Sequence, residues 1–402
     1  MSIAHITDMD VTGKRLVVRA DLNVPTEGGQ ITDTTRIDRF AAGMRPLLAR
    51  GARLVILTHF GRPQPNELNS SFSVDKFRPA LAEALGVPVR FSDVCADDSA
   101  VILSQQLADG EALLCENLRL NPGETENDPG FAAQLARLGD IYVNDAFSCA
   151  HRAHASTEAL ARLLPAAAGP LLVEELDALG AALDAPERPS VAIVGGAKVS
   201  TKIAVLKHLV QRLDAVIIGG GMANTFLFAD GAPMGKSLHE ADQVETVREI
   251  RRLAEKSGCY LHLPQDVVVA REFRAGADSL VVAAGDCPAD AMILDAGPKA
   301  LAAFQTVLSG ARTILWNGPL GAFEIPPFDV ATVELARSAA ERTRQGHAVS
   351  VAGGGDTVAA LNAAGVTQDF TYVSTAGGAF LEWLEGRTLP GIAALNGAAA
   401  AA

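Results

Sequence analysis

The stretch VAIVGGAKVSTKIAVL, residues 191–206, decides the fold class. Its first four residues are apolar and three of them are β-branched, which predicts a strand buried in a parallel sheet. Gly195 and Gly196 end the strand, and a helical segment is expected to carry Lys198 and Lys202 on one face. Free backbone N–H groups and the helix dipole make such a helix start an anion site. The stretch predicts a polyphosphate site, and an ordinary turn with two solvated lysines is the alternative.

The composition is that of an α/β protein with two domains. A chain of 402 residues exceeds what one core usually supports, and its 49% hydrophobic and 20% charged content is ordinary. The net charge of −13 argues against binding to nucleic acid or to an anionic membrane. Five scattered cysteines without a C-x-x-C pair indicate reduced thiols. No secretory signal or transmembrane run is recognisable, so we expect a cytoplasmic protein.

In the first half, short apolar strands alternate with helical segments. The strands are expected at residues 16–19, 54–58, 112–115 and 141–143, and this alternation predicts a parallel sheet. Ligands bind outside the carboxyl ends of such strands. The residues found there are Asp21, Asn23, Arg36, His59, Arg62, Arg119, His151, Arg152 and His154. Because arginine forks match phosphate and carboxylate oxygens, the set predicts a small anionic, phosphorylated ligand.

Two alternatives exist for these first-half residues. Any single arginine could be a solvated surface charge. Cys149, His151 and His154 could hold a metal ion, but zinc sites prefer spaced pairs of ligands and Arg152 would repel a cation.

The second half repeats the pattern with glycine in place of arginine. A break at residues 164–170 and a helical segment at 171–183 separate the halves. Strands expected at residues 215–218, 260–263, 292–294, 313–316, 348–351 and 371–374 run into loops. These loops contain Gly219, Gly220, Asn317, Pro319, Glu324, Gly353, Gly354, Gly355, Asp356 and Thr357. Glycine lets the backbone approach a ligand closely, and Asp356 could hold Mg²⁺ directly or through water. The half therefore predicts a nucleotide site.

Several familiar motifs are absent or incomplete. There is no G-x-G-x-x-G, no protein-kinase H-R-D or D-F-G, and no signature of a Ser-His-Asp triad. Residues 231–237, GAPMGKS, are one residue short of a P-loop and follow a helical segment instead of a strand.

With these residues in view, the chain resembles the phosphoglycerate kinase family from about residue 16 to residue 391. Eight strings occur in the family's order: VRADLNVP, LTHFGRP, ENLR, CAHRAH, GGAKVSTKI, IGGGMANTFL, WNGPLGAFE and GGGDT. The resemblance implies an α/β fold of two lobes, each a mostly parallel sheet flanked by helices, joined by a connecting helix around a hinge cleft. Residues 1–170 would bind 3-phosphoglycerate, 171–188 would connect, 189–385 would bind the nucleotide, and 386–402 would pack back on the first lobe.

The resemblance also implies the reaction and the roles of residues. The family transfers a phosphoryl group reversibly between 1,3-bisphosphoglycerate and ADP, giving 3-phosphoglycerate and MgATP, as a monomer. Substrate binding would fall to Asp21, Asn23, Arg36, His59, Arg62, Arg119 and Arg152. Arg36 and Lys198 would be catalytic, with Asp356 toward Mg²⁺. The nucleotide would be bound by Gly195, Gly196, Lys198, Lys202, Gly219, Gly220, Asn317, Pro319, Glu324, Gly353, Gly354, Gly355, Asp356 and Thr357.

One departure from the family pattern lies after the last strand. Ala376 stands where the family commonly has the first of three glycines, and Phe380 follows Ala379. A positive φ at Ala376 would strain the loop. Two other functions are weighed: a kinase of another small phosphorylated carboxylate, and a two-lobed binding protein without turnover. The alanine-rich end of the chain is expected to be loosely ordered.

Overall fold

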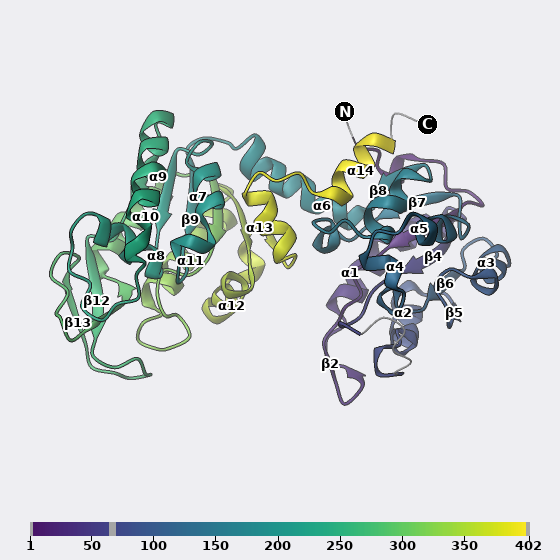
Figure 1. Ribbon diagram of the computed structural model, residues 1–402, viewed down its shortest axis with the longest axis horizontal. Helices are drawn as coiled ribbons and strands as arrows, with labels where there is room; N and C mark the ends of the chain where they lie inside the picture. The colour runs from purple at the N-terminus through teal and green to yellow at the C-terminus, as the bar shows by residue number, and fades with distance from the viewer. Residues whose placement is uncertain (1–2, 64–69, 399–402) are drawn as a thin grey trace. The chain divides into compact units, whose positions relative to one another are not determined.

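The computed structural model describes residues 3–63 and 70–398 of the chain. The chain forms two compact units. The first comprises the residues up to Leu176 and those from Thr388 onward, and the second is Asp177–Arg387. Each unit is built on a six-stranded sheet (Figure 1). The expected α/β class with a mostly parallel sheet in each half is confirmed.

The sheet of the first unit has the order β5-β6-β4-β1-β7-β8, and all neighbouring strands are parallel. Its strands are β1 (Arg15–Arg19), β4 (Arg53–Leu57), β5 (Val89–Ser92), β6 (Ala112–Cys115), β7 (Ile141–Asn144) and β8 (Ala166–Ala168). Arg19 lies opposite both Leu57 and Asn144, so β1, β4 and β7 end at the same level. The residues that follow these three strands therefore gather at one edge.

Helices cover this sheet because their apolar residues recur at helical spacing. In α1 (Thr35–Ala49), Ile37, Phe40, Ala41 and Met44 are buried in the same core as the sheet residues. The other helices are α2 (Arg78–Leu85), α3 (Asp98–Gln105), α4 (Pro122–Thr125), α5 (Pro129–Ala136), α6 (Pro170–Leu179) and α14 (Pro390–Ala398). A two-stranded hairpin is formed by β2 (Thr26–Glu27) and β3 (Gln30–Ile31). Helix α14 lies beside β8 in Figure 1.

The sheet of the second unit has the order β11-β10-β9-β15-β16-β17, again with parallel neighbours. Its strands are β9 (Ser190–Val194), β10 (Ala215–Ile218), β11 (Tyr260–His262), β15 (Thr313–Asn317), β16 (Val349–Gly353) and β17 (Tyr372–Ser374). Its helices are α7 (Ile203–Leu209), α8 (Gly220–Ala229), α9 (Val244–Ser257), α10 (Pro298–Gly310), α11 (Val330–Arg344), α12 (Gly355–Ala364) and α13 (Gly378–Leu384).

A second, three-stranded sheet in this unit corrects one expectation. The strand at residues 292–294 does not join the parallel sheet. It is part of β14 (Met292–Ala296), which pairs antiparallel with β12 (Asp266–Ala270). Strand β12 also pairs antiparallel with β13 (Ser279–Ala283). The sequence pattern identified an apolar strand here, but periodicity does not say which sheet a strand joins.

The segment between the halves also differs from the expectation. Part of the expected break at residues 164–170 is strand β8, whose three small alanines extend the first sheet. Helix α6 follows at Pro170, where the Asp145 carboxylate accepts the N–H of Leu171 at 2.8 Å. A π-helical turn, Gly180–Asp184, continues α6, and the residues from there to β9 are not helical.

Two further expectations concern membrane-spanning segments and the C-terminal end of the chain. Among the described residues, no helix combines the length and the apolar character needed to span a membrane. The expectation of a loosely ordered alanine-rich end is not met up to Ala398, which belongs to α14, and residues 399–402 lie outside the described part of the chain.

Candidate functional site

Three of the predicted arginines line one hollow of the first unit. Arg62 follows β4, Arg119 follows β6 and Arg152 follows β7, and they share the hollow with Pro63, Thr125 and His154. Burial lowers the pKa of Arg119, and the charges of Arg152 and Arg62 lower it further. Like charges held together in this way are stabilised when an anion enters between them. The hollow is suited to a phosphate group.

Asp21, Asn23 and Arg36 form a second group in the same unit. Arg36 Nη1 donates to Asp21 Oδ2 at 2.7 Å and to the Asn23 carbonyl at 3.3 Å. The Asn23 side chain in turn accepts the N–H of Gly61 at 3.1 Å. Ser148 Oγ also donates to Asp21 Oδ2, a contact that sequence reasoning missed. Arg36 is therefore held by its own unit, with a side chain that is 35% exposed.

His59 belongs to a buried part of this unit. It is 6% exposed, and its Nδ1 lies 3.0 Å from a guanidinium nitrogen of Arg19, which is 1% exposed. Burial and the charges of Arg19, Arg119 and Arg152 lower the pKa of His59 strongly, so the ring is neutral at neutral pH. Sequence reasoning missed Arg19, because at the end of an apolar strand it has the appearance of an ordinary boundary residue.

The alternative of a metal site at Cys149, His151 and His154 finds no support. Cys149 Sγ contacts Arg19 and Ser148, at 3.5 and 3.7 Å. His154 Nδ1 lies 3.7 Å from Glu124. Within the described ranges, no group of three or more histidine, cysteine or acidic side chains is arranged to hold a metal ion.

In the second unit, the glycine loops touch one another directly. A Cβ on Gly195 would lie 1.7 Å from the Pro319 carbonyl oxygen, so only glycine fits there. Gly220 has φ +65°, and a Cβ on it would lie 2.7 Å from the Gly196 oxygen. The loops after β9, β10 and β15 are thus packed backbone on backbone. Gly219 belongs to the same packing, since a Cβ there would meet Leu320.

Lys202 and Asn317 tie these loops together. Lys202 Nζ donates to the Gly195 carbonyl at 2.7 Å and to the Asn317 carbonyl at 2.9 Å. Asn317 Nδ2 donates to the Gly353 carbonyl, and Thr357 Oγ1 accepts the N–H of Gly318, both at 2.8 Å. Burial lowers the pKa of Lys202 to about 8, against the opposing effect of Asp356.

The start of α12 meets these loops. Gly354 is its N-cap, and Gly355, Asp356 and Thr357 form its first turn. Asp356 is exposed and lines the same hollow as Gly196 and Gly220. The first turn of α12 therefore offers free backbone N–H groups and one carboxylate to a ligand in that hollow.

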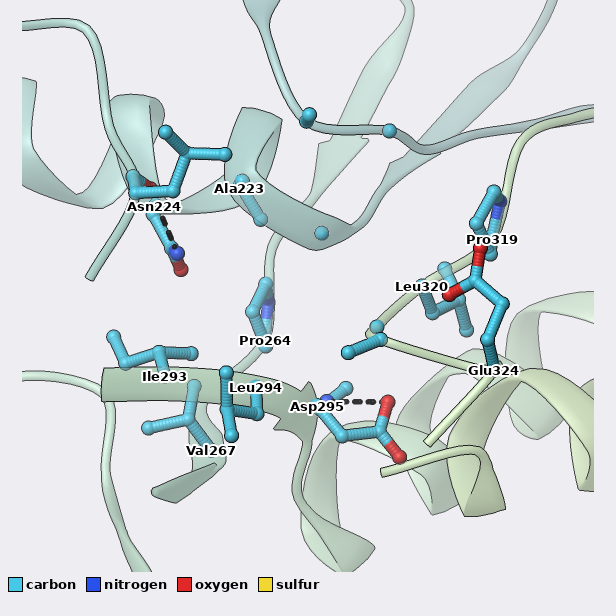
Figure 2. A pocket seen from close by; sticks show the side chains of 18 of the residues that line it. Ala223, Asn224, Pro264, Val267, Ile293, Leu294, Asp295, Pro319, Leu320 and Glu324 are labelled. Atoms are coloured by element: carbon cyan, nitrogen blue, oxygen red, sulfur yellow. Dashed lines mark hydrogen bonds between the residues drawn. The ribbon is translucent and has the colours of Figure 1, made fainter. Parts of the chain in front are cut away.

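This hollow encloses about 910 Å³ including its open mouth, and most of its lining is apolar. Pro319, Leu320 and Glu324 group on one side of it and Asn224 and Ile293 on the other (Figure 2). The apolar lining with few polar groups suits a flat organic ring. Of the predicted residues, Gly196, Gly220, Pro319, Glu324 and Asp356 line it directly.

The two lysines are placed differently from the prediction. Lys198 has extended backbone, with φ −137° and ψ 131°, and a 3₁₀ turn at Val199–Thr201 follows it. Helix α7 starts only at Ile203, after Lys202. The two lysines therefore do not share one helix face, because the i, i+4 rule applies only within a continuous helix. Lys198 is exposed and Lys202 is half-buried.

Asp295 is a residue of this hollow that the sequence analysis did not select. It is 2% exposed, and its Oδ2 accepts the N–H of Ala331 at the start of α11 at 2.9 Å. Burial raises its pKa to about 7. The carboxylate holds the start of α11 against β14, a role that only the tertiary contacts reveal.

The loop with the departure from the family pattern is unstrained at Ala376. Within the described part of the chain, Asn127 is the non-glycine residue with positive φ, so Ala376 does not adopt that conformation. Phe380 is fully buried, and its ring covers Gly353, where a Cβ would lie 2.7 Å away.

Comparisons with known proteins agree on one family. The family model described as phosphoglycerate kinase matches residues 6–387. Phosphoglycerate kinases of Cereibacter sphaeroides and Sinorhizobium fredii are 57% and 58% identical to this chain. These matches cover 97% and 98% of this chain and 98% and 99% of theirs.

Solved structures agree with the sequence matches. A phosphoglycerate kinase from Coxiella burnetii has a TM-score of 0.92 and 40% identity, covering 98% of this chain and 99% of its own. One from Pyrococcus horikoshii has a TM-score of 0.79 and 29% identity, with 99% of both chains covered.

Proposed function

Since this chain belongs to the phosphoglycerate kinase family, we propose that its first unit binds 3-phosphoglycerate and its second unit binds the nucleotide. The chain is a phosphotransferase with a carboxyl group as acceptor. It exchanges a phosphoryl group between 1,3-bisphosphoglycerate with ADP and 3-phosphoglycerate with ATP. The matches give no support to the alternative of another small phosphorylated carboxylate.

The assignment of 3-phosphoglycerate to the first unit and the nucleotide to the second rests on the contrast between the two hollows. One is lined by Arg62, Arg119 and Arg152, and the other by glycine loops and apolar side chains. The three arginines would hold the phosphate of 3-phosphoglycerate. Asp21 and Asn23 would hold its hydroxyl group, with His59 contributing a neutral donor.

The apolar hollow would take adenosine, between Pro319 and Glu324 on one side and Asn224 and Ile293 on the other. The phosphates would then reach the first turn of α12 and Lys202. The exposed carboxylate of Asp356 would hold the Mg²⁺ of the bound nucleotide. One carboxylate is enough for this ion, because water and phosphate oxygens supply most of its ligands. The bound ion would neutralise phosphate charge.

The chemistry requires little beyond positioning and charge. The carboxylate of 3-phosphoglycerate is already ionised at neutral pH, so no general base is needed. Arg36 and Lys198 would stabilise the charge on the transferring group. Because the two substrates would bind different units, direct in-line transfer requires the units to approach each other and exclude water, as in hinge-bending kinases. Arg36 must then exchange its contact with Asp21 for the phosphoryl oxygens.

The remaining expectations belong to the same proposal. We propose a cytoplasmic monomer. The five cysteines are all free and buried, which suits a reducing compartment.

Trapping with hydroxylamine tests the proposed reaction. The purified protein is incubated with MgATP, 3-phosphoglycerate and hydroxylamine, which converts an acyl phosphate to a hydroxamate. We expect hydroxamate only when both substrates are present. A protein that binds both ligands but forms no hydroxamate would be a binding protein, and this result would refute the proposal.

A further inference from the structure

Arg19 is a buried arginine below the predicted substrate residues. It is the last residue of β1, and its Nε donates to Ser156 Oγ at 2.9 Å. Ser156 Oγ donates onward to Glu124 Oε1 at 2.6 Å, and Glu124 is 1% exposed. The guanidinium also donates to the Ala20 carbonyl. Ser156 and the Ala20 carbonyl thus hold its position, and Glu124 balances its charge through Ser156.

A further partner of Arg19 is His59. Arg19 Nη2 lies 3.0 Å from His59 Nδ1. A guanidinium carries donors only, so Nδ1 must accept this hydrogen bond and cannot itself hold a proton. The other group near Nδ1 is Cys149 Sγ at 3.9 Å, a thiol whose pKa is raised by burial and which therefore keeps its proton. The thiol can donate or accept, and its sulfur accepts from Arg19 at 3.5 Å, so the state of Nδ1 is decided by the guanidinium, which can only donate.

The proton of the ring must then be on the other nitrogen. An imidazolium would place an N–H against the guanidinium, and Arg119 and Arg152 add further positive charge nearby. Within the described residues, His59 Nε2 makes no hydrogen bond. The Nε2–H group is therefore available to a ligand.

We propose that Arg19 is a positioning residue that fixes His59 as the neutral tautomer with its proton on Nε2, so that His59 donates one hydrogen bond to an oxygen of 3-phosphoglycerate. The naming of that ligand rests on the proposed function, whereas the tautomer rests on the geometry alone. The pair gives the site a donor that adds no charge to three arginines already lining one hollow.

The tautomer can be read directly by NMR on the full chain labelled with ¹⁵N-histidine. His208 serves as an internal reference, because its Nδ1 lies 2.8 Å from the Leu384 carbonyl and must therefore carry the proton. Signals are assigned with His59→Gln and His208→Gln. At pH 8 we expect His59 protonated on Nε2 and His208 on Nδ1. A His59 protonated on Nδ1, or on both nitrogens, would overturn the inference.

Addition of 3-phosphoglycerate tests the donor role. We expect the Nε2–H signal of His59 to shift while the Nδ1–H signal of His208 does not. Calorimetry on the same sample measures whether 3-phosphoglycerate binds, and so distinguishes a failure of the inference about His59 from a failure of the proposed function. If 3-phosphoglycerate binds without moving the His59 signal, the inference fails and the proposed function stands. If it does not bind, the proposed function fails, and the tautomer spectrum still decides the role of Arg19.

Variants separate positioning from general structural support. Arg19→Met removes the donor and should mix the His59 tautomers and raise the KM for 3-phosphoglycerate roughly tenfold, with the nucleotide KM unchanged. Arg15→Met is the matched control, since Arg15 is at the other end of β1 and pairs with Asp140 at 2.9 Å. Arg15→Met should change neither the tautomer of His59 nor the KM for 3-phosphoglycerate.

Arg19→Lys keeps a group that only donates and should keep the Nε2–H tautomer, which remains measurable if the methionine variant does not fold. A mixed tautomer in a folded Arg19→Lys variant, or an unaltered tautomer and KM in Arg19→Met, would show that Arg19 does not set the state of His59.

Discussion

The two units each have a six-stranded parallel sheet, but the loops at the ends of its strands offer opposite chemistry to a ligand. In the first, the loops after β4, β6 and β7 present arginines to a hollow. In the second, the loops after β9, β10 and β15 present bare backbone, packed so closely that a Cβ on Gly195 would collide with a carbonyl. A small, highly charged ligand is held by side-chain charge, whereas a large flat ligand needs room and backbone N–H groups.

The largest effect is expected from replacing Lys198, because it is a charged side chain in the unit whose site is otherwise built mostly from glycine loops. Lys198→Ala should lower kcat by roughly 10²-fold or more, since it removes a partner of the charge that develops in the transition state. Steady-state kinetics measures this. Lys207→Ala is the control, since Lys207 pairs with Glu249 on α9. Normal turnover of Lys198→Ala would remove Lys198 from the mechanism.

Arg119 tests the arginine-lined hollow. Arg119→Met removes a charged donor and should raise the KM for 3-phosphoglycerate by roughly 10- to 100-fold, while the nucleotide KM stays unchanged. The control is Arg137→Met, in which an exposed arginine of the same unit loses its contact with Asp98. Equal changes in both KM values would mean that Arg119 acts on the whole protein and not on one ligand.

Gly220 tests the backbone packing of the second unit. Gly220→Ala places a Cβ 2.7 Å from the Gly196 oxygen at φ +65° and should weaken nucleotide binding about tenfold. Gly231→Ala is the matched control, because Gly231 has φ +91° but open space around it, so it shares the strain without the collision. Calorimetric titration with MgADP compares the two. Equal loss in both variants would attribute the effect to backbone strain alone.

Lys202 gives the smallest and most specific effect, a dependence on pH. Burial lowers its pKa to about 8, so the ammonium is present below that pH and is lost above it. Phosphate binding needs the charged form, so affinity for MgADP should fall about eightfold between pH 7.5 and pH 9. Lys202→Met should bind more weakly with a flat pH profile over this range. An unchanged slope in that variant would assign the titration to another group.

The sequence predicted best what depends on strand ends. Apolar runs located β1, β4, β6 and β7, and parallel strands bring their carboxyl ends to one edge, so the clustering of Arg62, Arg119 and Arg152 could be predicted. The glycine loops were predicted for the same reason. What the sequence conveyed was the position of loops relative to a sheet.

Contacts between distant segments could not be read in this way. Arg19 is held by Ser156, 137 residues away, and nothing in its neighbourhood predicts a buried guanidinium. Asp295 likewise acts through the start of α11. The position of Lys202 depended on a 3₁₀ turn that hydrophobic periodicity does not reveal. Each of these is set by tertiary packing and not by local pattern.

The proposal that the first unit binds 3-phosphoglycerate and the second binds the nucleotide is tested most directly by calorimetric titration of Arg119→Met and Gly220→Ala. Each variant is titrated separately with 3-phosphoglycerate and with MgADP. The account predicts that Arg119→Met loses affinity for 3-phosphoglycerate alone and Gly220→Ala for MgADP alone, with the other affinity as in the unaltered protein. If either folded variant loses both ligands to the same degree, the two sites are not separate, and the account is contradicted.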